Sequence, residues 1–187
     1  MVAGSKVPFI ASQIWRGPPL SVISIRRIEP GDGDILSCLR LAALSDSPSA
    51  FSSTYSDESS RSAIEWAERV QASASGFDRA TFFAFHSEEP VGIVGGYREN
   101  PESPIVELVS MWTTPLARRM GVGRDLIRAL LAWAREGDAE AVGIWVTEGN
   151  ASAVSLYTAA GFVQIQGREP LRSESSEQVI RMMLSLP

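Results

Sequence analysis

The sequence contains only one cysteine and one histidine, Cys38 and His86, among its 187 residues. A single cysteine cannot close a disulfide within the chain, which is typical of proteins kept in a reducing compartment. The two residues together supply too few of the usual ligands for a zinc site built by this chain, so we expect no metal. We also expect Cys38 to be a small core residue rather than a nucleophile, because no basic partner for it is evident.

Long apolar runs and a positive net charge are also absent. No apolar run near the start of the chain is long enough to span a membrane. The short apolar stretch 7–10 after Lys6 makes a poor signal peptide. The formal net charge of −5 argues against non-specific binding to nucleic acid. We therefore predict a cytoplasmic protein whose partners include neither nucleic acid nor a membrane.

The composition is that of one soluble globular domain. Apolar residues make up 44% of the chain and charged residues 21%, both ordinary fractions. A chain of 187 residues is long enough for one domain with a good core, but short for two. Residues 1–21 show no persistent periodicity, and we expect them to be a loosely ordered extension. Residues 22–187 are then the folded domain.

Apolar periodicity predicts a single α/β domain with a mixed sheet. Segment 106–112 reads as a strand that stops before Pro115, and the segment after Gly123 has helical spacing. A strand follows at 141–146, so 106–112 and 141–146 should run parallel around a crossover helix. Further strands are expected at 22–28, 81–86, 91–97, 162–166 and 179–184, and helices at 34–44, 62–75 and 150–160. We expect a loop at 45–60. In helix 62–75 we expect Ala63, Ala67, Val70 and Ala74 to share the apolar face.

The turn before the crossover helix is crowded with arginine: Arg118, Arg119, Arg124 and Arg128. These cations lie at the positive end of the helix dipole, where each is unfavourable by about 0.3–1 kcal/mol. Gly121 and Gly123 let the backbone approach a ligand closely, with N–H groups free at the helix start. A bound polyanion would remove the conflict, because the N–H groups, the dipole and the arginines all attract phosphate. The alternative is a solvated arginine-rich turn.

Two common phosphate loops do not fit this turn. A P-loop ends in Gly-Lys-Ser/Thr, and a dinucleotide fingerprint needs a third glycine where residue 126 is leucine. Segment 118–123 instead resembles the acyl-coenzyme A binding motif of the GNAT N-acetyltransferases, Gln/Arg-x-x-Gly-x-Gly/Ala. Its marked positions are Arg118, Gly121 and Gly123. Arg119 departs from many members of the family, which carry glycine there.

A second segment resembles the same family. Residues 150–162 match its next motif, Asn-x-x-Ala-x-x-Leu-Tyr-x-x-x-Gly-Phe, at every marked position. Asn150 is also a good helix N-cap, and Gly161 is placed to end the helix in a left-handed conformation. Two motifs in the family's order are more specific than either alone. The resemblance extends over residues 22–184.

The resemblance implies a mostly antiparallel mixed sheet flanked by helices. Strands 106–112 and 141–146 would splay apart past a bulge near residues 111–112, and acyl-CoA would enter the gap. Main-chain groups near Met111 and Thr113 would then bind the pantetheine arm as an extra strand would be bound. The implied acyl donor is acetyl-CoA. The residues expected to bind it are Met111, Trp112, Thr113, Arg118, Arg119, Gly121, Val122, Gly123, Arg124, Asn150 and Tyr157.

Two side chains are candidates for catalysis. Tyr157 is the candidate acid, because its counterpart in the family often directs its hydroxyl at the thiol sulfur, and a tyrosine that titrates near 10 stays protonated at neutral pH. Its alternative role is a packing ring. Glu107 is the candidate base, because it interrupts an apolar strand at the position where histone-acetylating members place a basic glutamate. Its alternative is a glutamate facing solvent or paired with an arginine.

The leading function is an N-acetyltransferase that moves the acetyl group of acetyl-CoA directly to a primary amine in a ternary complex. A non-catalytic CoA-binding sensor or partner module is the alternative. The acceptor is a small-molecule or peptide amine: polyamine, amino acid, antibiotic, peptide N-terminus and lysine all stay open, as does a homodimer. We expect the acceptor pocket to be formed by loop 45–60, the hairpin at Tyr97 and loop 167–178. Candidates for attracting an ammonium group are Asp57, Glu58 and Glu99.

Overall fold

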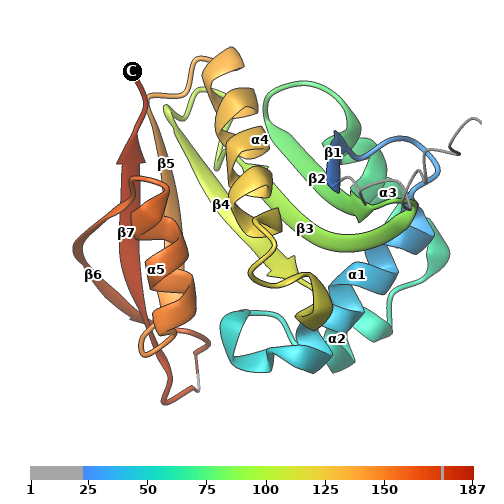
Figure 1. Ribbon diagram of the computed structural model, residues 1–187, viewed down its shortest axis with the longest axis horizontal. Coiled ribbons are helices and arrows are strands. Elements are labelled where there is room, and N and C mark those ends of the chain that lie inside the picture. Colours follow the sequence, from blue (N-terminus) through green and yellow to red (C-terminus); the bar gives the residue numbers. More distant parts are fainter. Residues whose placement is uncertain (1–22, 174) are drawn as a thin grey trace, which may run out of the picture.

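The computed structural model of the chain describes residues 23–173 and 175–187, which form a central sheet with helices packed against it (Figure 1). The strands are β1 Ile23–Arg27, β2 Arg79–His86, β3 Glu89–Tyr97, β4 Ile105–Thr113, β5 Ala141–Thr147, β6 Val163–Pro170 and β7 Gln178–Ser185. The helices are α1 Gly33–Asp46, α2 Tyr55–Ser59, α3 Ala63–Ala74, α4 Val122–Glu136 and α5 Ala151–Ala159, with short 3-10 turns η1 Pro48–Ala50 and η2 Pro115–Ala117. The extension predicted for residues 1–21 lies outside the described residues.

The sheet has the order β1-β2-β3-β4-β5-β7-β6. Only β4 and β5 run parallel within the described residues, and every other neighbouring pair is antiparallel. The parallel pair is joined by α4, as a crossover connection requires. The predicted single α/β domain with a mixed, mostly antiparallel sheet is confirmed.

The parallel ladder between β4 and β5 is short. It runs only from the pair Ile105–Ala141 to the pair Glu107–Gly143. Past Glu107 the two strands diverge, and Figure 1 shows the widening gap between them. The main-chain groups on this edge of β4 therefore have no partner strand on the β5 side.

A bulge in β4 marks the place where the strands part. Opposite β3, Ile93 pairs with Trp112 and Gly95 pairs with Val109, so β4 has one residue more than β3 in this interval. Ser110 takes up the irregularity with a positive φ of 56°. A bulge of this kind bends its strand and re-aims the side chains that follow. The predicted bulge is present, one position earlier than expected.

The two faces of the sheet carry two separate hydrophobic clusters. In β2, Phe82 packs with Leu130 of α4, whereas the neighbouring Phe83 packs with Leu39 of α1 and Val70 of α3. This follows from the period of two in a strand, which sends successive side chains to opposite faces. Helices α1 and α3 therefore cover one face of the sheet and α4 covers the other.

Two predictions about buried faces are wrong. Helix α3 begins at Ser62 as expected and buries the predicted Val70, but Trp66 and Ser73 are buried with it while Ala63 and Ala67 are exposed. Trp66 explains why a different face of the helix is buried, because its ring offers far more apolar area than a row of methyl groups. Cys38 is exposed rather than in the core. Helix α1 buries positions 36, 39, 40, 43 and 44, and position 38 falls outside this stripe.

The segment 45–60 is not the continuous loop that we predicted. It contains the turn η1 and the short helix α2, which is capped by the side chain of Thr54 accepting a hydrogen bond from the N–H of Asp57. Five residues are too few for a helix that is stable by itself. Its support comes from Glu58, which is buried against arginines of other helices.

Candidate active site

The loop that precedes α4 has an unusual backbone. Gly121 is the N-cap of α4 and adopts a left-handed conformation with φ 86°, which disfavours any residue that has a Cβ. The first hydrogen bond of the helix runs from the N–H of Asp125 to the carbonyl of Gly121. The N–H groups of Val122, Gly123 and Arg124 therefore have no acceptor within the helix and point out of its positive end.

Arg119 is also left-handed, with φ 64°. For a residue other than glycine this conformation costs about 1–2 kcal/mol. Glycine adopts the same conformation without this cost. Strained residues of this kind cluster at ligand sites, so the geometry supports a binding role for the loop.

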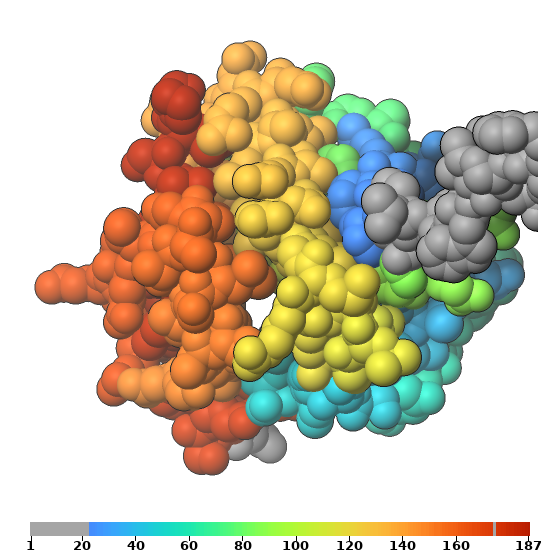
Figure 2. Space-filling model, in the orientation of Figure 1, coloured from blue at the N-terminus to red at the C-terminus, as the bar shows by residue number. Residues whose placement is uncertain are grey.

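A cavity of about 650 Å³ lies between this loop, the second half of β4 and the start of α5. Figure 2 shows an opening through the surface between the yellow segment before α4 and the orange segment that includes α5. Ten of the eleven predicted cofactor residues line the cavity: Met111, Trp112, Thr113, Arg118, Arg119, Gly121, Gly123, Arg124, Asn150 and Tyr157. The side chain of Val122 is buried in the core instead, so only its N–H group is available to a ligand.

The arginines of the loop are exposed and only partly neutralised. Arg118 forms an ion pair with Asp46 at the end of α1, and Arg124 and Arg128 lie near Asp125. Arg119 has no ion-pair partner within the part of the chain that the structure describes. The entrance thus combines free N–H groups, a helix dipole and an excess of positive charge, which suits a polyphosphate.

A second cavity, of about 340 Å³, adjoins the first. Both are lined by Met111 at the bulge, by Phe51, and by Asn150 and Tyr157 of the second sequence motif. The second cavity is completed by residues of the three segments predicted for the acceptor: Ala50, Ser52, Tyr97, Glu169, Pro170 and Leu171. A ligand in each cavity would meet its neighbour at the bulge of β4.

This geometry has close counterparts in known proteins. The sequence model of the Acetyltransferase (GNAT) family matches residues 41–162, which is most of the chain. The chain belongs to the GNAT acetyltransferase family. Its members are acyl-CoA-dependent N-acetyltransferases, so the predicted class of enzyme is confirmed.

Solved structures show the same fold. A GNAT acetyltransferase from Streptococcus pneumoniae is 22% identical, with a TM-score of 0.74 over 89% of this chain and 100% of that one. A ribosomal-protein-alanine N-acetyltransferase from Brucella melitensis is 21% identical, with a TM-score of 0.70 over 87% and 99%. A spermidine N-acetyltransferase from Vibrio cholerae, solved with CoA and spermine, is 20% identical, with a TM-score of 0.69 over 87% and 95%. No curated protein sequence matches the chain.

Tyr157 of this acetyltransferase is buried on the inner face of α5. Its ring packs edge-on against Phe162, with 5.6 Å between the ring centroids. Burial raises the pKa of Tyr157 above its ordinary value of 10.0, so the hydroxyl stays protonated well beyond neutral pH. The residues that the structure describes provide no hydrogen-bond partner for this hydroxyl, although its residue lines both cavities.

Asn150 holds the start of α5. Its side-chain oxygen accepts a hydrogen bond from the N–H of Ala153 at 3.1 Å, which confirms the predicted N-cap. The left-handed Gly161, with φ 99°, lies just past the end of the same helix, also as predicted. The cap fixes the side chain of Asn150 at the wall of both cavities and leaves its amide N–H groups directed away from the cap.

Glu107 is neither isolated nor solvated. Arg181 of β7 donates two hydrogen bonds to its carboxylate, of 2.6 Å and 2.5 Å. Arg181 itself lies over the ring of Trp145, with its guanidinium carbon 5.1 Å from the ring centroid. The predicted alternative of a glutamate paired with an arginine therefore describes the ground-state geometry, and any amine at Glu107 has to share the carboxylate with Arg181.

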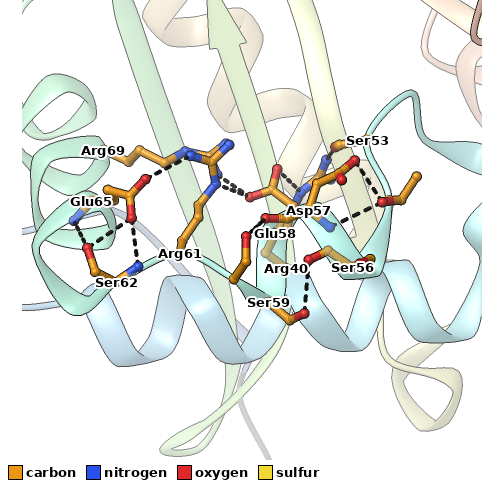
Figure 3. Close-up of polar contacts among 12 residues, drawn as sticks. Arg40, Ser53, Ser56, Asp57, Glu58, Ser59, Arg61, Ser62, Glu65 and Arg69 are labelled. Carbon is orange, nitrogen blue, oxygen red and sulfur yellow. Dashed lines mark hydrogen bonds and ion pairs between the residues drawn. The ribbon is translucent and has the colours of Figure 1, made fainter.

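The acidic residues proposed to attract an ammonium group lie elsewhere. Asp57, Glu58 and Glu99 do not line the acceptor cavity. Glu58 is buried and accepts hydrogen bonds from Arg61 at 2.8 Å and Arg69 at 2.6 Å. Figure 3 shows these arginines, together with Arg40, arranged around the carboxylate. Glu58 thus organises cations and is itself out of reach of a ligand.

Sequence reasoning missed three residues that the fold brings to the site: Arg40, Asp46 and Arg181. Two of them act through partners that are distant in the sequence: Asp46 pairs with Arg118, 72 positions away, and Arg181 pairs with Glu107, 74 positions away. A weak signal existed for Arg40, which interrupts the apolar stripe of α1 at a buried position. Within residues 23–173 and 175–187 no three His, Cys, Asp or Glu side chains cluster as a metal site would require. No helix there has both the length and the hydropathy to cross a membrane.

Proposed function

We propose that this acetyltransferase moves the acetyl group of acetyl-CoA directly to a primary amine while both substrates are bound. The observation that carries the proposal is that the two cavities share a wall at Met111, Asn150 and Tyr157. Donor and acceptor can meet there, so no group on the protein has to carry the acetyl group between them. Holding the two reactants in contact supplies most of the rate acceleration that alignment can contribute.

The residues of the donor cavity fit the coenzyme. The backbone at Gly121 leaves space for a diphosphate where any other residue would place a Cβ, and the first-turn N–H groups of α4 supply donors. The exposed arginines of the loop add positive charge, with Arg119 carrying no competing ion pair among the described residues. Beyond Glu107 the free edge of β4 offers main-chain groups of Met111 and Thr113 to the amides of the pantetheine arm.

Four tasks fall to the chain's own groups. Main-chain N–H groups at the bulge of β4 polarise the thioester carbonyl. The hydroxyl of Tyr157 gives its proton to the sulfur as the carbon–sulfur bond breaks, and the nitrogen now bonded to the carbonyl carbon releases its surplus proton, which returns to the tyrosinate directly or through water. Glu107 takes a proton from the ammonium form of the acceptor, directly or through water, while Arg181 fixes the position of the carboxylate. The shared wall at Asn150 aligns the two substrates.

Initial rates measured over a grid of acetyl-CoA and amine concentrations test the ternary complex. Direct transfer predicts double-reciprocal lines that intersect. Parallel lines would contradict it, because they indicate an acetylated protein intermediate. The alternative function, a CoA-binding module without turnover, predicts CoA binding by calorimetry but no CoA release with any amine in a broad panel.

A further inference from the structure

Arg40 is a buried cation with incomplete partners. It lies on α1 under the acceptor cavity, and only 8% of its side chain is exposed. One terminal nitrogen donates to the hydroxyl of Ser53 at 2.5 Å, and the guanidinium lies over the ring of Phe51. Its Nε and Nη1 atoms are buried and have no hydrogen-bond partner among the residues that the structure describes. Unsatisfied buried donors are costly and call for a reason.

Glu58 does not complete the partnership. Its nearest oxygen lies 3.7 Å from Nε of Arg40, whereas its other oxygen receives hydrogen bonds from Arg61 and Arg69. The Glu58 carboxylate therefore faces three guanidinium groups, of which that of Arg61 also lies 3.8 Å from Glu65, so one positive charge is left over (Figure 3). Burial lowers the pKa of Arg40, and Glu58 offsets this only in part because Arg69 and Arg61 act in the opposite direction. The cluster has room for a further anion.

A small chamber lies beside Arg40. Its volume is about 60 Å³, and Arg40, Arg69 and Arg79 line it together with Ser73 and Ser110. No aspartate or glutamate of the described residues lines it. A space of this size holds a few water-sized groups, which is the scale of a carboxylate. The bulge residue Ser110 and Arg40 also line the acceptor cavity, so the chamber is a side pocket of that cavity.

The acceptor cavity carries the opposite charge on other walls. Glu107 and Glu169 line it, from β4 and β6. Figure 1 shows β6 on the side of β4 opposite to α1, which carries Arg40. A molecule with an ammonium group and a carboxylate matches this arrangement, because each of its charges meets the opposite sign. A polyamine would place a second cation against the arginines.

We propose that the acceptor is a small amine that also bears a carboxylate, and that the carboxylate binds at Arg40 in the side chamber while the amine faces Tyr157 and Glu107. Binding turns the guanidinium from the wall toward the chamber and satisfies its free N–H groups. The proposal rests on the transferase function above and narrows its acceptors to amino-acid-like molecules. It excludes polyamines as preferred substrates.

Matched acceptors test this directly. The full chain is assayed with acetyl-CoA and amino acids, each paired with its carboxamide and its decarboxylated amine, for example lysine with cadaverine. We expect kcat/KM for the carboxylate member to be about 10- to 100-fold higher, the usual range for charge-assisted hydrogen bonds. Equal values, or a preference for the diamine, would overturn the proposal. Absence of product from every amine would overturn the transferase function as well, whereas product without a preference would overturn only this inference.

Variants can show whether Arg40 itself recognises the carboxylate or only supports the fold. Arg40→Met keeps an unbranched chain over Phe51 and removes the charge, so it should lower kcat/KM for the amino acid about 10- to 100-fold more than for its decarboxylated partner. Arg79→Gln changes an exposed residue of the chamber and should shift the same ratio by a smaller factor, which keeps the test valid if Arg40→Met fails to fold. Arg135→Gln, an exposed arginine on α4 away from the chamber, should leave the ratio unchanged. An equal loss for both acceptors in Arg40→Met and Arg79→Gln would contradict a carboxylate site.

Discussion

Arg181 reaches Glu107 across an intervening strand, because Gly143 of β5 has no side chain in the way. Glu107 lies in β4 and Arg181 in β7, on either side of β5 in the sheet. Gly143 is the register partner of Glu107, and a Cβ there would collide with the Arg181 guanidinium. The arrangement fixes a half-buried carboxylate at the place where the parallel ladder ends, one step before the strands separate.

Glu107→Gln tests whether this carboxylate takes the proton from the acceptor. CoA binding should be unchanged, and turnover near neutral pH should fall by about 10²–10⁴-fold because the variant has no carboxylate to accept the proton. Raising the pH should partly restore turnover, since more of the amine then arrives without its proton. Steady-state kinetics from about pH 5 to about pH 10, close to the ordinary pKa of a primary amine, provide the pH–rate profile.

Arg181→Gln is the matched control for that experiment. It retains the carboxylate of Glu107 but removes the guanidinium that holds it, so turnover should fall by a smaller factor than in Glu107→Gln while CoA binding stays unchanged. If Glu107→Gln instead keeps wild-type turnover, the amine loses its proton by another route. Glu107 would then serve only to hold Arg181.

Asp46→Asn should lower stability in a pH-dependent way. Asp46 accepts a hydrogen bond from Nε1 of Trp112 at 2.9 Å and pairs with Arg118. The Trp112 hydrogen bond, with further contributions from Ser47 and Arg118, lowers the pKa of Asp46 below its ordinary value of 3.8. A lowered pKa stabilises the folded state above the unfolded pKa, and this contribution is lost as pH falls through the folded pKa.

The expected loss at pH 7 is about 1 kcal/mol, the difference between a charged and a neutral hydrogen-bond acceptor, or about 2–4 °C in Tm for a chain of this size. Thermal melts of wild type and variant should converge only when the pH falls below 3.8, where both acceptors become neutral. A Tm difference that stays constant through that range would show that the charge of Asp46 contributes nothing.

The features that sequence could predict are those encoded over a few neighbouring residues. The glycine at 121, the cap at Asn150 and the left-handed Gly161 each follow from local backbone requirements, and the structure contains all three. The parallel placement of β4 and β5 followed from the single helix that connects them as a crossover. Local rules of this kind need no knowledge of the rest of the chain.

The features that sequence could not predict depend on distant partners. The Ser/Asp/Pro-rich composition of residues 45–60 predicted a loop, and a helix of five residues such as α2 has little intrinsic stability. It is held by Glu58, whose partners Arg40 and Arg69 lie on α1 and α3. The charge of Glu58 suggested a site for an ammonium group. Because Glu58 is buried among arginines, its charge holds three guanidinium groups beside the acceptor cavity instead of binding a ligand.

Gly121→Glu should abolish CoA binding and leave the protein folded. The new side chain adds a Cβ at a left-handed position and a negative charge where the diphosphate would lie. Isothermal calorimetry with CoA measures the loss. Gly31→Glu is the matched control, since Gly31 also has a positive φ, of 103°, and does not line the donor cavity. Apart from its chain neighbours, no atom of the described residues lies within 4 Å of the position that a Cβ would take there. Near-normal CoA affinity in Gly121→Glu would overturn the assignment of the donor site.

Tyr157→Phe should separate chemistry from packing. The change removes a hydroxyl that has no hydrogen-bond partner among the described residues and leaves the ring against Phe162 in place. If the hydroxyl protonates the departing sulfur, turnover should fall by about 10²–10⁴-fold, the usual contribution of a positioned acid. Affinity for acetyl-CoA should hardly change, because the phosphate loop and the edge of β4 are intact.

The melting temperature of Tyr157→Phe is the control that separates a loss of chemistry from a loss of stability. The Tyr157 hydroxyl makes no hydrogen bond to the described residues and its residue lines both cavities, so its removal breaks no hydrogen bond among these residues and the Tm of Tyr157→Phe should stay close to that of wild type. Because burial raises the pKa of Tyr157, the wild-type rate should also show no alkaline decline from this residue below its ordinary pKa of 10.0. Wild-type turnover in Tyr157→Phe would reduce Tyr157 to a packing ring. The shared wall of the two cavities would then align the substrates while the thiolate leaves without a side-chain acid.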